Sequence, residues 1–144
     1  MKLAPMFLAL LALAACQRQA TEAPAASPPD PPPAPTVSDF GQPMTARGNE
    51  PFWAVRIEGV TLTLLRPGEP ELAFQAPGMT ASPGQAIWGA RAADGQTLKL
   101  TLRISECSDG MSDLRYPMAA EVEVAGQLMT GCAAKTAELP REGG

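Results

Sequence analysis

The sequence predicts an all-β domain, a small antiparallel meander of seven or eight strands that closes into a barrel. Apolar and polar residues alternate with a period of two in one segment after another, which is typical of strands with one buried face. Glycine-containing turn signals separate these segments, and no stretch combines a helical apolar stripe with caps. A sandwich is the alternative. The barrel is favoured because hairpin follows hairpin without a long crossover.

The segment 97–105 alternates most regularly, with Leu98, Leu100, Leu102 and Ile104 on one face. The other candidate strands are 53–58, 60–64, 72–75, 86–92, 120–124 and 128–132. Tight turns are expected at Glu58-Gly59 and Asp94-Gly95, because glycine tolerates positive φ. Residues 77–84 are expected to form a longer loop.

Residues 1–15 have the features of a secretory signal peptide. A basic start precedes an apolar run from Leu3 to Leu13, which is shorter than the roughly 20 residues of a membrane-spanning helix. The stretch Leu13-Ala14-Ala15-Cys16 looks like a bacterial lipobox, in which cleavage follows Ala15 and Cys16 is acylated. Several acyl chains, palmitate among them, anchor a protein stably. A plain signal peptide with a chance cysteine is the alternative.

This pattern predicts a lipid-anchored protein of the bacterial cell envelope. Gln17, rather than Asp, follows the acylated cysteine, which resembles lipoproteins forwarded to the outer membrane, facing the periplasm. Residues 16–42 are rich in Pro and Ala and poor in apolar bulk, so we expect a disordered tether. The folded domain is expected over 43–137, followed by a frayed tail over 138–144.

Charge and composition exclude several classes of function. The net charge is −4 without a block of like sign, which argues against nucleic acid and against a polybasic grip on lipid head groups. The chain has no His, so Ser-His and Cys-His nucleophiles are excluded and the commonest transition-metal ligand is missing. We expect no cofactor, no metal and no enzymatic activity.

Two cysteines remain once Cys16 carries lipid. In an oxidising compartment Cys107 and Cys132 are most simply a disulfide, which closes a loop of about 26 residues. The chain-entropy model values such a loop at about 3–4 kcal/mol. A redox or metal pair is the alternative, without a Cys-x-x-Cys spacing or a nearby His to support it.

The first motif that stands out is residues 46–53, Ala-Arg-Gly-Asn-Glu-Pro-Phe-Trp. Phe52 and Trp53 point to opposite faces of the strand that they enter. One interpretation is a structural plug, with Trp53 buried and Arg47 paired to Glu50. The other is a ligand or partner surface at one end of the sheet, built from the same three residues.

The second motif is residues 107–117, Cys-Ser-Asp-Gly-Met-Ser-Asp-Leu-Arg-Tyr-Pro. It predicts a tight loop in which Asp109 and Asp113 accept backbone N–H bonds. A cation loop through these two residues and Glu106 is an alternative that lacks the calcium-loop spacing. A hydrolytic carboxylate pair has less support still. The candidate binding residues here are Asp109, Ser112, Asp113, Arg115 and Tyr116.

With both motifs in hand, the chain resembles a family of small proteobacterial envelope lipoproteins of unknown function. Its members carry an Arg-Gly-Asn-Glu-Pro-Phe-Trp stretch, then a Cys-x-Asp-x-Met-Ser-x-x-x-Tyr-Pro stretch and a late Gly-Cys. Here these are residues 47–53, 107–117 and Gly131-Cys132. The resemblance implies an envelope location and says little about activity.

A looser resemblance bears on function. Residues 112–116, Ser-Asp-Leu-Arg-Tyr, are similar to the Ser-Gly-x-Lys/Arg-Tyr loop of membrane-bound C-type lysozyme inhibitors. That resemblance implies that Ser112 and Arg115 would enter the acidic lysozyme cleft. Asp113 departs from the pattern, and a carboxylate facing that cleft costs affinity. We therefore expect a non-enzymatic binding or structural module with an envelope partner, and lysozyme inhibition as the alternative.

Overall fold

The computed structural model describes residues 36–141, in which nine strands and two short 3-10 helices follow one another. Residues 1–35 lie outside, and with them the predicted signal peptide, Cys16 and most of the predicted tether. The elements are η1 (Val37–Gly41), β1 (Met44–Asn49), β2 (Phe52–Glu58), β3 (Thr61–Leu65), β4 (Leu72–Gln75), β5 (Met79–Ser82), β6 (Gln85–Ala92), β7 (Thr97–Ser108), β8 (Arg115–Val124), β9 (Gln127–Lys135) and η2 (Thr136–Glu138).

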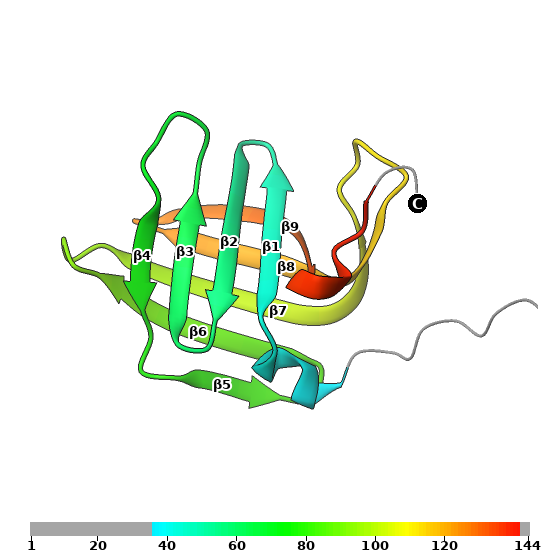
Figure 1. Ribbon diagram of the computed structural model, residues 1–144, viewed down its shortest axis with the longest axis horizontal. Helices are drawn as coiled ribbons and strands as arrows, with labels where there is room; N and C mark the ends of the chain where they lie inside the picture. The colour runs from blue at the N-terminus through cyan, green and yellow to red at the C-terminus, as the bar shows by residue number, and fades with distance from the viewer. Residues whose placement is uncertain (1–35, 142–144) are drawn as a thin grey trace, which may run out of the picture. The chain divides into compact units, whose positions relative to one another are not determined.

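Eight of these strands close into an antiparallel barrel, which confirms the predicted fold class (Figure 1). The order is β4-β3-β2-β1-β9-β8-β7-β6, so that β1 and β9 join the two ends of the domain. A two-residue pairing of β4 with β6 closes the ring. β5 is an additional strand that pairs only with β6, outside the ring.

The alternation seen in the sequence places one face of each strand inside the barrel. β2 shows it plainly, because Trp53, Val55 and Ile57 are buried while Phe52, Arg56 and Glu58 are exposed. The interior is filled by large side chains, of which Trp88 and Phe74 are the largest that are fully buried. Binding to another molecule must therefore use the outer face or the ends of the barrel.

η1 packs at the end of the barrel where β1 begins. Phe40 of η1 is 3% exposed and belongs to the main core. The Lys135 ammonium of β9 lies 2.7 Å from the Asp39 carboxylate and holds η1 against the barrel. The packed domain thus begins before the predicted boundary at residue 43, and Val37–Gly41 is helical within the predicted tether.

Two strands differ from the sequence prediction. β1 was not expected, because its inner residues Met44, Ala46 and Gly48 form no run of large apolar side chains. β5 lies within the segment 77–84, which was expected to be a loop, and all four of its residues are exposed. The turns at Gly59 and Gly95 adopt the positive φ expected of them, at 61° and 90°.

The predicted frayed tail is partly packed. Leu139 contacts a small apolar cluster and the Pro140 carbonyl accepts a hydrogen bond. Residues 142–144 lie outside the described part of the chain. No helix in residues 36–141 is long and apolar enough to cross a membrane.

The ion pair between Lys135 and Asp39, which holds η1, predicts that the stability of the fold depends on pH. The Lys135 ammonium, with the N–H and hydroxyl of Thr36, lowers the pKa of Asp39 from 3.8 to about 2. Because the pKa of Asp39 is lower in the folded chain than in the unfolded chain, the ionised carboxylate stabilises the fold at pH values above the unfolded pKa. This stabilisation is lost as the pH falls through the folded pKa. Asp39→Asn should therefore lower the free energy of unfolding at pH 7, and the difference from wild type should shrink between pH 4 and pH 2. Urea titrations across this range measure both proteins. If the difference in unfolding free energy between the two proteins does not change with pH, the stabilising role of this ion pair is contradicted.

Candidate functional site

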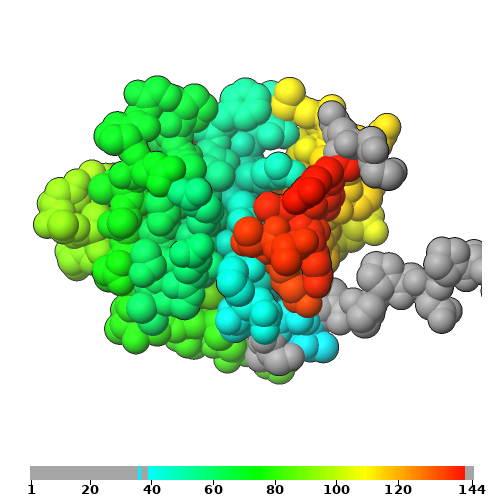
Figure 2. Space-filling model, viewed as in Figure 1, coloured from blue at the N-terminus to red at the C-terminus, as the bar shows by residue number. Residues whose placement is uncertain are grey.

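The two motifs and the late Gly-Cys meet at one end of the barrel. The first motif forms the end of β1 and the start of β2. The second forms the end of β7, the loop 109–114 and the start of β8, and the third lies in β9. Figure 2 shows the loop 109–114, in yellow, beside the β1–β2 turn with a small opening between them. Three segments far apart in the sequence therefore build one site.

β1 and β9 approach each other so closely here that only glycine fits. A Cβ on Gly131 would lie 2.1 Å from the Arg47 carbonyl oxygen. A Cβ on Gly48 would lie 2.4 Å from Nε1 of Trp53 and 2.5 Å from the Thr130 carbonyl oxygen. Trp53, which is 3% exposed, thus packs directly on Gly48 and plugs this end, as the structural interpretation predicts.

Arg47 points to the outer face of β1 and holds the start of β8. Its guanidinium lies over the ring of Tyr116, 5.0 Å from the centroid, and donates to the hydroxyl of the same residue. It also donates to the Pro140 carbonyl oxygen at 3.3 Å. Arg47 therefore joins the barrel wall, the second motif and the C-terminal segment.

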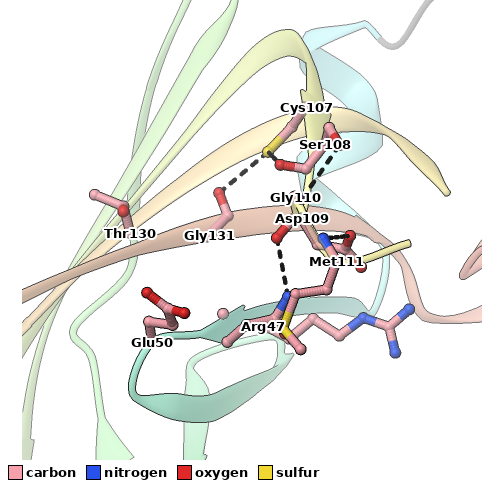
Figure 3. A pocket seen from close by; sticks show the side chains of 11 residues that line it. Arg47, Glu50, Cys107, Ser108, Asp109, Gly110, Met111, Thr130 and Gly131 are labelled. Atoms are coloured by element: carbon pink, nitrogen blue, oxygen red, sulfur yellow. Dashed lines mark hydrogen bonds between the residues drawn. The ribbon is translucent and has the colours of Figure 1, made fainter. Parts of the chain in front are cut away.

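The predicted Arg47–Glu50 pair is wrong. Glu50 follows the end of β1 in the turn, where the chain reverses, whereas Arg47 leans back along the outer face toward Tyr116. In Figure 3 the guanidinium and the Glu50 carboxylate point away from each other. Glu50 is exposed, and no described residue forms a salt bridge or hydrogen bond with it.

Cys107 and Cys132 form the predicted disulfide, with their sulfur atoms 1.98 Å apart. It ties β7 to β9 across β8, the strand that lies between them. A register shift after Ile104 takes Cys107 out of the main core. Cys107 then joins a second apolar cluster on the outer face of β9, where the tail runs beside the loop (Figure 1). Its members are Tyr116, Cys132, Ala134, Cys107, Leu114 and Leu139.

Asp109 organises the loop 109–114, as predicted. Its carboxylate accepts the backbone N–H of Ser112 at 2.9 Å, the Ser112 hydroxyl at 2.8 Å and the backbone N–H of Met111 at 3.1 Å. The Ser112 N–H, followed by the other two donors, lowers the pKa of Asp109. The side-chain amide of Asn49 donates to the Asp109 carbonyl at 3.0 Å and ties the loop to β1.

Asp113 does not take the predicted part in the loop. It is exposed and accepts no hydrogen bond from the described residues, whereas the loop N–H groups donate to Asp109, Ser108 and Ser112. The predicted alternative of a cation loop fares no better. Within residues 36–141 no three His, Cys, Asp or Glu side chains gather in a way that would hold a metal ion.

A hollow of about 470 Å³ separates the β1–β2 turn from the loop 109–114 (Figure 3). Arg47, Asn49 and Glu50 line one side, and Ser108, Asp109 and Met111 line the other. A second hollow of about 490 Å³ lies on the opposite side of the same turn, against Phe52 and Pro67. The turn therefore projects between two hollows.

The side chains of five residues of the two motifs extend outward without a described partner. Phe52 is 56% and Met111 is 68% exposed, and Glu50, Asp113 and Arg115 are exposed charges with no ion pair in the described chain. We call these five residues the rim. Phe52 and Met111 were not predicted as site residues, although the alternation that buries Trp53 requires Phe52 to face outward.

Comparisons of the chain with family models, with curated proteins and with solved structures found no match. The two resemblances drawn from the motifs therefore stay predictions.

The close packing at Gly48 predicts an asymmetry between two glycines in strands. Gly48→Ala should lower the free energy of unfolding by about 2–3 kcal/mol, because the new methyl overlaps Trp53 and a carbonyl. Gly89→Ala, on the exposed face of β6 with no atom within 4 Å of the added Cβ, should be neutral or stabilising by about 0.5 kcal/mol. Chemical denaturation of both variants measures this. Equal effects would refute the proposed packing of Trp53 on Gly48.

Proposed function

We propose that this chain is a lipid-anchored protein of the bacterial envelope whose barrel is a non-enzymatic binding module, and that the rim is its binding surface. One observation carries the proposal. The two motifs divide cleanly into residues that hold the barrel end together and residues that have no structural partner.

The first group accounts for most of the polar side chains. Arg47 is bound to Tyr116, Asn49 to the loop backbone, and Ser112 to Asp109. These contacts fix the β1–β2 turn and the loop 109–114 relative to each other. A rigid base is what a binding surface requires, because little conformational freedom is then lost on association.

The second group is the rim. Phe52 and Met111 expose apolar surface, each beside one of the two hollows, and Arg115 is free to pair with a carboxylate. Aromatic residues, Met and Arg are enriched at protein interfaces. A protein partner in the envelope therefore fits the rim better than a small molecule, because both hollows are open and would enclose a small molecule only in part.

A non-enzymatic role is supported by the chemistry of the hydroxyl groups. The sequence holds no His to activate a nucleophile. The Ser112 hydroxyl, the one hydroxyl in the loop 109–114, donates to Asp109 and accepts the backbone N–H of Leu114 at 3.3 Å. This hydroxyl therefore stabilises the conformation of the loop.

Inhibition of a C-type lysozyme is the second candidate, and the exposed, unpaired Arg115 favours it. The Ser112 hydroxyl is engaged with Asp109, so an inhibitor would rely chiefly on Arg115 to reach an acidic cleft. Purified protein at micromolar concentration should then slow C-type lysozyme, and Arg115→Ala should abolish the effect. Full lysozyme activity in excess protein would remove this candidate and leave the binding module standing.

The exposure of the rim predicts that substitutions there weaken binding without changing the stability of the fold. Arg115→Ala and Met111→Ala should each leave the melting temperature unchanged, because neither side chain has a described partner, and should weaken capture of envelope proteins by the mature chain. Arg103→Ala is the matched control. It removes an exposed cation that pairs with Glu121 at 2.9 Å on the barrel wall, and it should cost at most about 1 kcal/mol of stability while leaving capture intact. Quantitative mass spectrometry of captured proteins measures the effect. A lowered melting temperature for Arg115→Ala would make the residue structural.

Anchoring is tested separately at Cys16. Mass spectrometry of the protein from a bacterial envelope should find an amino terminus at Cys16 that carries acyl chains. Cys16→Ser should leave the chain uncleaved and without acyl mass. A wild-type protein without acyl mass would overturn the anchoring and leave the proposal for the rim untouched.

A further inference from the structure

β5 (Met79–Ser82) has a free edge. The barrel closes without it, because β4 pairs with the end of β6 through Phe74 and Gln75. β5 pairs with the first half of β6, Gln85–Trp88, and has no strand on its other side among the described residues. Figure 1 shows it along the lower border of the domain. Its outer edge therefore presents backbone N–H and C=O groups that another extended strand would satisfy.

The chemistry of this edge does not oppose pairing. Proteins commonly protect an edge with Lys or another charge. Here no charged residue occurs between Glu71 and Arg91, although charged residues make up 18% of the chain. Thr80, Ala81 and Ser82 are small and exposed, so a second backbone can approach closely.

The occupant that fits best is the same edge of a second copy. Two neutral strands related by a two-fold axis pair antiparallel without bringing like charges together. Such a pair uses the free edge of both copies, so it closes at two. Pro77 and Pro83 flank β5 and, lacking an N–H, limit the ladder to the residues between them.

The anchor brings such edges together. The chain enters the described domain at Thr36 and forms η1, which contacts both β5 and β6. Nineteen residues, 17–35, separate Cys16 from this point. At the polyproline rise of about 3.1 Å they reach roughly 60 Å at most. Copies held this close to one membrane have a high effective concentration, which favours pairing even through a short ladder.

We propose that two copies of this chain pair through β5, edge to edge and antiparallel, on the membrane that anchors them. The pairing rests on the proposed lipid anchor at Cys16. It does not depend on the rim, which lies at the other end of β1.

Photo-crosslinking in bacteria that express the full-length chain tests the pairing. A benzophenone amino acid at Thr80 should give a crosslinked species of twice the chain mass. The same probe at Lys99, exposed on β7 but paired on both sides, with β6 and with β8, should give none. With the two-fold axis at Ala81, so that this residue faces Ala81 of the second copy, Ala81→Lys should weaken the crosslink about fivefold, because like charges then face each other. Co-expression of Ala81→Lys with Ala81→Glu should restore it, which excludes misfolding as the cause.

Other outcomes identify other occupants and overturn the proposal. A crosslinked product of different mass would mean a different protein on β5, and a crosslink without change of chain number would mean a segment of the same chain. If mass spectrometry finds acyl groups on Cys16 and no crosslinked product forms, the pairing alone is refuted. Absence of those groups would instead refute the anchor on which it rests.

Discussion

The close approach of β1 and β9 is the constraint on which the rest of this structure depends. It joins the first and last strands of the barrel, and at Gly131 the two backbones leave no space for a Cβ. With β1 fixed there, Gly48 lies under Trp53, which fills the end of the barrel. Arg47 points to the outer face, where it reaches Tyr116, and Asn49 reaches the loop backbone. One backbone contact thus gives three consecutive residues three different tasks.

The disulfide completes this arrangement from the other side. Because Ala133 belongs to the main core, the neighbouring Cys132 and Ala134 face outward. The Cys107–Cys132 bond, Tyr116 and Leu139 cover that outer face with a second apolar cluster. The loop 109–114 is therefore attached at its base twice, by the covalent bond of Cys107 and by Asn49, which donates to the Asp109 carbonyl. The charged and apolar side chains that project beyond it have no structural task, which is why we interpret them as a binding surface.

Much of the fold could be predicted from the sequence. The period of two in β2, β6 and β7 places large apolar residues inside, and the glycines at the turns need positive φ. β1 could not be predicted in the same way, because close packing there requires small residues, which do not produce an alternation of large apolar and polar side chains. β5 escaped because both of its faces are exposed. At the site, the disulfide and the role of Asp109 followed from residue types, whereas the Arg47–Tyr116 contact joins residues 69 positions apart and carries no local signal.

The central claim is that the disulfide, Arg47 and the loop 109–114 form one unit with the end of β1. Hydrogen–deuterium exchange of the protein before and after reduction of the Cys107–Cys132 bond tests it most directly. The account predicts faster exchange in the loop 109–114, at the start of β8 and in residues 47–49 of β1, with exchange in β3, β4 and β6 unchanged. Faster exchange confined to the loop, or spread evenly over all strands, would contradict it.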